Sequence, residues 1–146
     1  MYLDEKTNRP KKTKTYLVCG APASGKTSYV TSHKAPGDFV LDLDVIRQAL
    51  GAPDKTSDCF QPQVMAIRDV LFQHVSFNRI GVKTAWVIAG LPNRYKREAL
   101  ARKLGAEIIF IATPFEECIT RAMNDPERKD KEKQRQIITQ YFQMMD

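Results

Sequence analysis

A glycine-rich loop that ends in lysine and threonine stands near the start of the chain. Residues 20–27 have the sequence GAPASGKT, which matches the pattern G-x-x-x-x-G-K-T. Glycine at the first and sixth positions lets the backbone curl, so that successive N–H groups point inward toward an anion. Lys26 can then reach β- and γ-phosphate oxygens, and the Thr27 hydroxyl can bind Mg²⁺. The residues that we expect to contact the phosphates of ATP or another nucleoside triphosphate are Gly20, Ala21, Pro22, Ala23, Ser24, Gly25, Lys26, Thr27 and Ser28.

Two aspartates and an arginine follow the second apolar segment of the chain. Asp42 and Asp44 are separated by one residue, and Arg47 comes about one helical turn later. A carboxylate here can accept a proton from an attacking hydroxyl or bind the shell of Mg²⁺, and an arginine can bind a substrate phosphate with two hydrogen bonds. We assign Asp44 as catalytic base, Asp42 as metal ligand and Arg47 as substrate clamp. In the alternative, Asp44 is only a helix N-cap and Arg47 a solvated helix residue.

The third apolar segment ends without an acidic residue. Many proteins with this phosphate-binding loop place a carboxylate there to orient the water shell of Mg²⁺. Residue 89 is alanine, so that role is absent or falls to Asp42 or Asp44. Arg94 follows a few residues later. It either contacts the acceptor substrate or is an ordinary surface residue in the first turn of a helix.

A charged segment near the end of the chain is a candidate lid over the phosphates. Residues 121–133 contain Arg121, Arg128 and several lysines. A basic lid that closes over the γ-phosphate would neutralise charge during transfer and exclude water. Arg121 lies off the apolar stripe of its helix, so we expect it to point into the cleft as a catalytic cation. Arg128 is either a second lid cation or part of a solvated connection, because acidic residues are interspersed with the basic ones.

Apolar segments typical of buried strands alternate with segments of helical periodicity. The sequence predicts strands over residues 15–19, 39–42, 84–88 and 107–111. Helices are predicted over residues 26–33, 45–50, 63–78 and 94–104, the last capped by Asn93. Two further helices follow. One begins with a capping box, Thr113 to Glu116, and the other carries apolar residues from Ile137 to Met145.

This alternation predicts an α/β domain over residues 15–146. Its centre would be a parallel sheet of about four to five strands, with helices on both faces. Ligands of such sheets bind at the carboxyl ends of the strands, where the glycine-rich loop and the aspartates both lie. Residues 1–14 form a polar, basic arm, which we interpret as a disordered, solubilising segment.

Composition and charge exclude several classes of protein. The 146 residues are 42% hydrophobic and 27% charged, as in soluble globular domains. No segment has the apolar length of a membrane span, and the three cysteines lack zinc-ligand spacing, so we expect a cytoplasmic protein without a membrane or zinc site. The net charge of +6 favours phosphorylated substrates or nucleic acid without deciding between them. Along the sequence the aromatic residues are not interleaved with the basic ones, as they are in RNA-binding motifs.

The loop and the three clusters together resemble small P-loop kinases of the adenylate kinase, shikimate kinase and polynucleotide kinase type. Asp44 to Arg47 is similar to the D-x-x-R of polynucleotide kinases, in which the aspartate is the base and the arginine binds the acceptor phosphate. Asp42 to Asp44 is similar to the D-x-D of shikimate kinases. Gly90 to Arg94 is similar to the G-F-P-R turn of adenylate kinases, displaced by one residue. The chain also resembles compact AAA-type ATP-binding proteins of bacteriophages.

The resemblance implies a phosphotransferase that uses ATP and Mg²⁺. The acceptor would be a nucleic-acid 5′ end, a nucleotide or a small metabolite. Two alternatives remain: an ATPase or switch subunit that acts on DNA or a partner protein, and a nucleotide-binding protein without turnover. A ring ATPase normally has a pair of acidic residues after a core strand, and residues 86–90 offer none.

Overall fold

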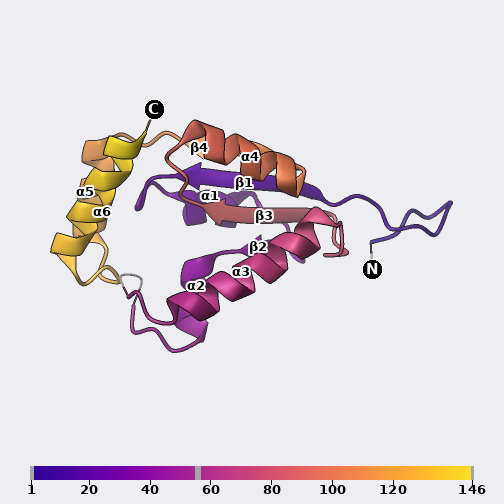
Figure 1. The fold of residues 1–146 in the computed structure, drawn as a ribbon, viewed down its shortest axis with the longest axis horizontal. Helices are drawn as coiled ribbons and strands as arrows, with labels where there is room; N and C mark the ends of the chain where they lie inside the picture. Colours follow the sequence, from indigo (N-terminus) through magenta and orange to yellow (C-terminus); the bar gives the residue numbers. More distant parts are fainter. Residues whose placement is uncertain (1, 55–56, 146) are drawn as a thin grey trace.

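A four-stranded parallel sheet forms the centre of the molecule, as can be followed in Figure 1. The computed structural model describes residues 2–54 and 57–145. In these residues the strands are β1 (Lys14–Gly20), β2 (Phe39–Leu41), β3 (Thr84–Ala89) and β4 (Ala106–Ile111). They lie in the order β2-β3-β1-β4, and each pairing is parallel. The predicted parallel sheet is confirmed, with a strand number at the lower end of the predicted range.

Helices connect the strands and follow the last of them. Those in the described part of the chain are α1 (Lys26–His33), α2 (Leu43–Ala49), α3 (Gln61–Ser76), α4 (Arg94–Leu104), α5 (Phe115–Asn124) and α6 (Lys131–Met144). No helix within residues 2–54 and 57–145 has the length and apolar character needed to cross a membrane.

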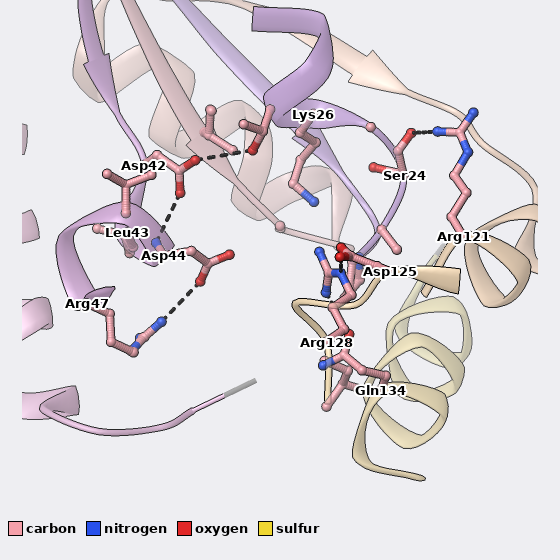
Figure 2. A pocket seen from close by; sticks show the side chains of 18 of the residues that line it. Ser24, Lys26, Asp42, Leu43, Asp44, Arg47, Arg121, Asp125, Arg128 and Gln134 are labelled. Carbon is pink, nitrogen blue, oxygen red and sulfur yellow. Dashed lines mark hydrogen bonds and ion pairs between the residues drawn. The ribbon is translucent and has the colours of Figure 1, made fainter. Parts of the chain in front are cut away.

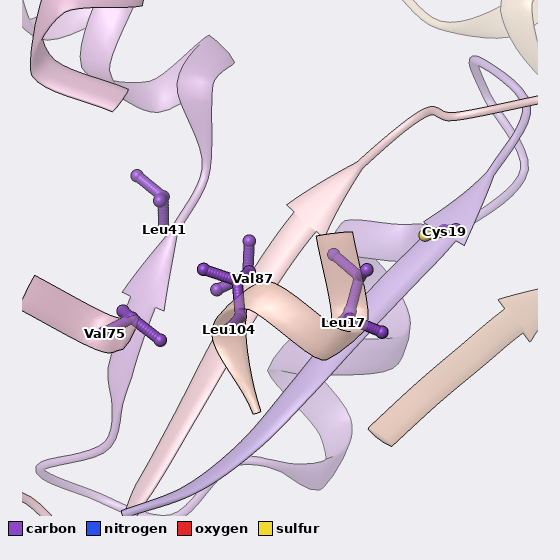
Figure 3. Close-up of a cluster of buried hydrophobic side chains, with 7 residues drawn as sticks. Leu17, Cys19, Leu41, Val75, Val87 and Leu104 are labelled. Carbon is purple, nitrogen blue, oxygen red and sulfur yellow. The ribbon is translucent and has the colours of Figure 1, made fainter. Parts of the chain in front are cut away.

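Different helices cover the two faces of the sheet. On one face, Leu17 of β1 and Val87 of β3 belong to a buried cluster with Val75 of α3 and Leu104 of α4 (Figure 3). On the other face, Val18 of β1 packs in a cluster with α1. Neighbouring residues of a strand point to opposite faces, so burial on both sides explains why the strands are almost continuously apolar.

Helices α5 and α6 pack against each other beyond the carboxyl ends of the strands (Figure 1). Cys118 of α5 and Ile138 of α6 are completely buried in a cluster that also contains Ala21 of the glycine-rich loop. The helix pair is therefore fixed against the loop by apolar packing, which places its polar residues beside the phosphate-binding position.

Helix α2 begins two residues earlier than the sequence indicates. Asp42 is its N-cap, since Oδ1 of Asp42 accepts a hydrogen bond from the backbone N–H of Asp44 at 3.0 Å. Asp44 lies in the first turn, where a negative charge suits the helix dipole. The alternative in which Asp44 serves only as the N-cap is therefore wrong. Helix α3 likewise begins at Gln61 rather than at residue 63.

The capping box predicted at the start of α5 is wrong. Pro114 is the N-cap of this helix, and the cap has no side-chain hydrogen bond. The Thr113 hydroxyl donates instead to the backbone carbonyl of Ser24 in the glycine-rich loop, at 2.7 Å. Thr113 thus ties the connection between β4 and α5 to the loop.

The N-terminal segment joins the sheet at its last residues. Lys14 is the first residue of β1, and Thr13 is buried, with its hydroxyl donating to the carbonyl of Val82 at 2.6 Å. Before them the chain folds back on itself through an antiparallel bridge between Leu3 and Pro10. The separate arm over residues 1–14 stays a prediction, although Thr13 and Lys14 form part of the sheet region.

Candidate active site

A pocket with a volume of about 580 Å³ lies at the carboxyl ends of the strands (Figure 2). Residues 22–28 form one wall, and residues 42–48 of the β2–α2 region form the wall opposite. Residues 88–90 at the end of β3 also line the pocket, together with Ser57 and Asp58 before α3 and side chains of α5, α6 and the connection between them. The pocket thus brings together the predicted phosphate loop, the aspartates, Arg47, Arg121 and Arg128.

The glycine-rich loop has the backbone that the pattern G-x-x-x-x-G-K-T predicts. Gly25 has a φ of 100°, in the left-handed region that favours glycine. At Gly20, a Cβ would lie 2.7 Å from Oγ of Ser24 and 2.9 Å from the carbonyl oxygen of Ile111. Helix α1 begins at Lys26 without a side-chain cap. Its first N–H groups are therefore available to an anion, as in other helix N-termini that bind phosphate.

The side chain of Lys26 lies over this loop. Its Nζ donates to the backbone carbonyls of Gly20 at 2.8 Å and Ala21 at 2.7 Å. Burial, together with the positive charge of Arg128, lowers the pKa of Lys26 to about 8. An anionic ligand would relieve both effects, because it supplies the negative charge that this ammonium group lacks.

A hydroxyl and a carboxylate that can hold a metal ion adjoin the loop. The Thr27 hydroxyl donates to Oδ2 of Asp42 at 3.2 Å, and the Asp42 side chain is buried beneath the pocket. No cluster of three or more His, Cys, Asp or Glu side chains suited to a metal ion occurs in the part of the chain that the structure describes. These two residues fit Mg²⁺, which is usually held by one or two carboxylates, substrate phosphates and water.

Asp44 and Arg47 form an ion pair on the opposite wall. Nη1 of Arg47 is 3.1 Å from Oδ1 of Asp44, and Nη2 donates to Oε1 of Gln61 at 2.7 Å. The Arg47 side chain is 12% exposed, and its Nε has no hydrogen-bond partner among the described residues. Partial burial and the nearby Asp42 raise the pKa of Asp44. Raising the pKa of a carboxylate makes it a stronger base.

Arg128 points into the pocket (Figure 2). Its Nη1 donates to Oε1 of Gln134 at 2.6 Å, and its Nε lies 3.3 Å from Oδ2 of Asp125. Gln134 is 1% exposed, so this support is buried in the α5–α6 pair. The charge of Arg128 also acts on Lys26 and Asp44, since it lowers the pKa of both groups. Arg128 is thus the candidate lid residue whose charge reaches the phosphate loop and the aspartate wall.

Arg121 contacts the outer side of the phosphate loop. Its Nη1 donates to the backbone carbonyl of Ser24 at 3.0 Å, and its Nη2 forms an ion pair with Glu117 at 2.7 Å. Figure 2 shows its guanidinium beyond Ser24, on the side away from Lys26. The residue also belongs to the pocket lining. The geometry therefore supports a loop-holding role more directly than the predicted catalytic one.

Arg94 is not brought to the pocket. It lies on the exposed face of α4 and forms an ion pair with Glu98 at 3.0 Å. The neighbouring Arg97 takes the inward position, donating to the carbonyls of Leu91 at 2.9 Å and Pro92 at 2.8 Å. Of the two readings of Arg94, the surface residue is the one that the structure supports.

Three lining or supporting residues were missed as site residues. The Tyr141 hydroxyl donates to the carbonyl of Gly90 at 2.9 Å and thereby anchors α6 to the end of β3. Gln134 lies on the same face of α6, seven residues earlier, and holds Arg128. Gln61 holds Arg47 from the start of α3. The sequence contained one signal, a glutamine on the otherwise apolar face of the last helix.

Comparisons with known proteins agree with this geometry. An AAA domain family model matches residues 16–144. A chain of the Pnkp1/Rnl/Hen1 RNA repair complex is similar in structure, with a TM-score of 0.60 and 13% identity. The match covers 98% of this chain but 49% of the other, so this chain spans about half of its length. The protein APE1195 matches with a TM-score of 0.57 and 18% identity, over 88% and 76% of the two chains. A comparison with curated proteins found no match.

Proposed function

The chain belongs to the AAA domain family, and from this premise we propose that it is an ATP- and Mg²⁺-dependent phosphotransferase. The fold is that of P-loop nucleotide-binding proteins of the kinase and ATPase type. We propose that the γ-phosphoryl group passes to a hydroxyl or phosphate of an acceptor held on the Arg47 side of the pocket. The proposed acceptor is a nucleic-acid 5′ end, a nucleotide or a small metabolite.

One observation carries this proposal: the pocket is lined both by a phosphate loop and by a separate acidic and basic wall. Lys26 and the amides of residues 21–27 would hold the β- and γ-phosphates. Asp44 and Arg47 stand across the same pocket, where a second substrate has space. An acceptor that carries a phosphate would use this separate cationic wall in addition to the phosphate loop.

Asp44 is the proposed base. As the acceptor oxygen attacks the γ-phosphorus, the hydroxyl proton passes to the Asp44 carboxylate and the bond to the β-phosphate oxygen breaks, releasing ADP. The raised pKa of Asp44 favours this proton transfer. Arg47 would bind a phosphate of the acceptor through its guanidinium, with Gln61 fixing the orientation of that group.

The remaining charged residues are proposed to hold and neutralise the phosphates. Thr27 and Asp42 would bind Mg²⁺, which neutralises charge on the β- and γ-oxygens when bound. Arg128 would stabilise charge on the transferring group. Arg121 would keep the loop closed through its hydrogen bond to the carbonyl of Ser24, at 3.0 Å.

A nucleic-acid 5′-hydroxyl end is the first acceptor to test. The similar chain named above belongs to an RNA repair complex. We would measure transfer of the labelled γ-phosphate of ATP to 5′-hydroxyl RNA and DNA, to nucleosides and nucleotides, and to a panel of hydroxylated metabolites. A labelled acceptor that disappears in Lys26→Ala supports the proposal. Release of inorganic phosphate with no labelled product from any acceptor would contradict it.

The same assay covers the main alternative, an ATPase or switch subunit. We consider this alternative because the family that matches the chain is described as an AAA domain. It predicts ATP turnover that rises with DNA or a protein partner while no acceptor becomes labelled. Against it stands Ala89 at the end of β3, where such ATPases normally carry acidic residues.

A further inference from the structure

The positive charge of the chain is concentrated at the end of the sheet opposite the pocket. Residues 4–14, 79–83 and 102–107 carry nine lysines and arginines and three acidic residues, a surplus of six. This surplus equals the net charge of the whole chain, +6, so all other residues together are neutral. The pocket lining is almost balanced, with five basic and four acidic side chains. The excess positive charge of this protein therefore lies outside the pocket.

The fold brings these three segments together at the amino ends of β1, β3 and β4. The N–H of Lys14 donates to the carbonyl of Lys83 at 2.9 Å. The side-chain amide of Asn78 donates to the carbonyl of Lys11 at 3.0 Å and joins the α3–β3 connection to the N-terminal segment. Lys12 extends to Gly105, at the end of α4, with Nζ 3.8 Å from the position of a Cβ there. We call this region, formed by Lys11, Lys12, Lys14, Arg79, Lys83, Arg102 and Lys103, the amino-end surface; all seven residues are exposed.

Aromatic rings accompany the cations of the amino-end surface. Arg79 lies over the ring of Phe77 at 5.2 Å, and the Phe77 side chain is 64% exposed. Lys11 lies over the ring of Tyr2, and Lys14 over the ring of Tyr16, both at 5.3 Å. Phe77 with Arg79 and Lys14 with Tyr16 are pairs two residues apart in the sequence, and the fold adds the pair of Tyr2 and Lys11. Basic and aromatic residues are therefore interleaved on this surface. Phe77 thus presents an exposed aromatic ring beside a cation, the combination on which a nucleic-acid base can stack.

We propose that the amino-end surface binds single-stranded nucleic acid. Lysines and arginines would contact the phosphate backbone, and the ring of Phe77 would stack with a base, which is how sequence-independent binders of single strands combine charge with aromatic platforms. Basic residues are favourable at the C-terminus of a helix, and this explains the presence of Arg102 and Lys103 in the last turn of α4. This effect does not account for the lysines of the N-terminal segment or for Arg79 and Lys83.

The amino-end surface and the pocket lie at opposite ends of β1, so the length of this strand separates them. The seven residues of β1 span about 23 Å at about 3.3 Å per residue. At the rise of about 3.4 Å per nucleotide that a strand has in a stacked duplex, roughly seven nucleotides would span this length, and an extended single strand would need fewer. Binding at the amino-end surface does not require that the pocket be a kinase site, so the two proposals can fail independently.

The experiment measures the affinity of the full chain for a fluorescently labelled 20-nucleotide oligothymidylate, without ATP, at several salt concentrations. We expect the logarithm of affinity to fall with the logarithm of salt by about 0.7 for each phosphate contact. The triple variant Lys11→Glu, Lys12→Glu, Lys83→Glu should bind at least tenfold more weakly and show a shallower salt dependence. Phe77→Ala should bind about fivefold more weakly with an unchanged salt dependence, since it removes stacking but no charge.

A matched triple variant, Lys34→Glu, Lys96→Glu, Lys129→Glu, changes the net charge equally at exposed positions outside the amino-end surface. It should keep nearly the full affinity. Equal weakening by both triples would overturn the proposal, because it would show only an effect of net charge. No loss in Phe77→Ala, or preference for a duplex over a single strand, would also overturn it. Lys26→Ala should abolish phosphate transfer without changing oligothymidylate affinity, which separates this proposal from that of the kinase.

Discussion

Asp42 joins the nucleotide wall of the pocket to the opposite wall. One of its carboxylate oxygens accepts from the Thr27 hydroxyl at 3.2 Å, and the other caps α2 through the N–H of Asp44 at 3.0 Å. Helix α2 carries Asp44 and Arg47, the residues proposed to act on the acceptor substrate. Asp42 caps this helix and is also the proposed Mg²⁺ ligand, so one side chain supports both parts of the site. Loss of Asp42 should therefore affect metal binding and helix stability together, and these effects can be separated by two substitutions.

Asp42→Asn should preserve the cap and lose the charge. Asparagine is as good an N-cap as aspartate, so stability should change little, whereas nucleotide binding should require a higher Mg²⁺ concentration. Asp42→Ala should lose both and unfold about 0.5–2 kcal/mol more easily. Denaturant unfolding and Mg²⁺ titrations of nucleotide affinity measure the two effects. If Asp42→Asn keeps the wild-type Mg²⁺ dependence, Asp42 is not a metal ligand.

Asp44→Asn should reduce phosphate transfer by about 10²–10⁴-fold, the usual size of general base catalysis. The affinity for ATP should remain, because Asp44 is on the wall opposite the phosphate loop. The rate of the wild type should fall as pH falls through the raised pKa of Asp44, since protonation removes the base. Single-turnover rates across pH check this. Transfer at the full rate in Asp44→Asn would exclude Asp44 as the base.

ATP affinity should weaken as pH rises through about 8, the pKa of Lys26 in the free protein. Below this pH the ammonium is charged and attracts the phosphates, whereas above it the neutral amine must take up a proton on binding. Calorimetry in buffers of different ionisation enthalpy should therefore detect proton uptake at pH 9. Lys26→Arg is the matched control, because arginine stays charged and should show no such uptake.

The sequence predicted the elements that depend on local patterns. The glycine-rich loop, the four strands and the helix from Arg94 to Leu104 follow from residue spacing, caps and apolar periodicity, and the structure shows all of them. Burial on both faces requires nearly continuous apolar segments, and these made the strands recognisable in the sequence. The predicted cap of α4 is also present, since the Asn93 side chain accepts a hydrogen bond from the N–H of Lys96. Local physical chemistry therefore determines this part of the fold.

Partners that are distant in the sequence could not be predicted in this way. Thr113 fits a capping box locally, but its hydroxyl bonds to a loop 89 positions earlier. Arg94 and Arg97 are equivalent by type, and only the packing of α4 on Phe110, whose ring lies 4.4 Å from the Arg97 guanidinium, decides which one points inward. The contact between Lys11 and the Tyr2 ring likewise depends on the N-terminal segment folding back on itself.

Arg128 and Arg121 should differ in their effects on catalysis. Arg128→Ala should lower the transfer rate by about 10³-fold or more, as loss of a cation at the transferring phosphate does, with a smaller change in ATP affinity. It should also move the alkaline fall in ATP affinity to higher pH, because the charge of Arg128 lowers the pKa of Lys26. Arg121→Ala should mainly weaken ATP binding, since it loses its hydrogen bond to the loop carbonyl of Ser24. An unchanged pH profile in Arg128→Ala would contradict the proposed proximity to Lys26.

Thr113→Val should destabilise the fold by about 0.5–1.5 kcal/mol, the usual contribution of one hydrogen bond, because valine keeps the shape of threonine but cannot donate to the carbonyl of Ser24. The loss should be larger than in Thr120→Val, whose hydroxyl bonds only within α5, to the carbonyl of Glu116, on an exposed surface. Denaturant unfolding of both variants checks this. ATP should raise the unfolding free energy of Thr113→Val less than that of the wild type, since the loop that holds the phosphates has lost its hydrogen bond to Thr113. Equal unfolding free energies in the two variants would show that the contact between Thr113 and Ser24 does not stabilise the loop.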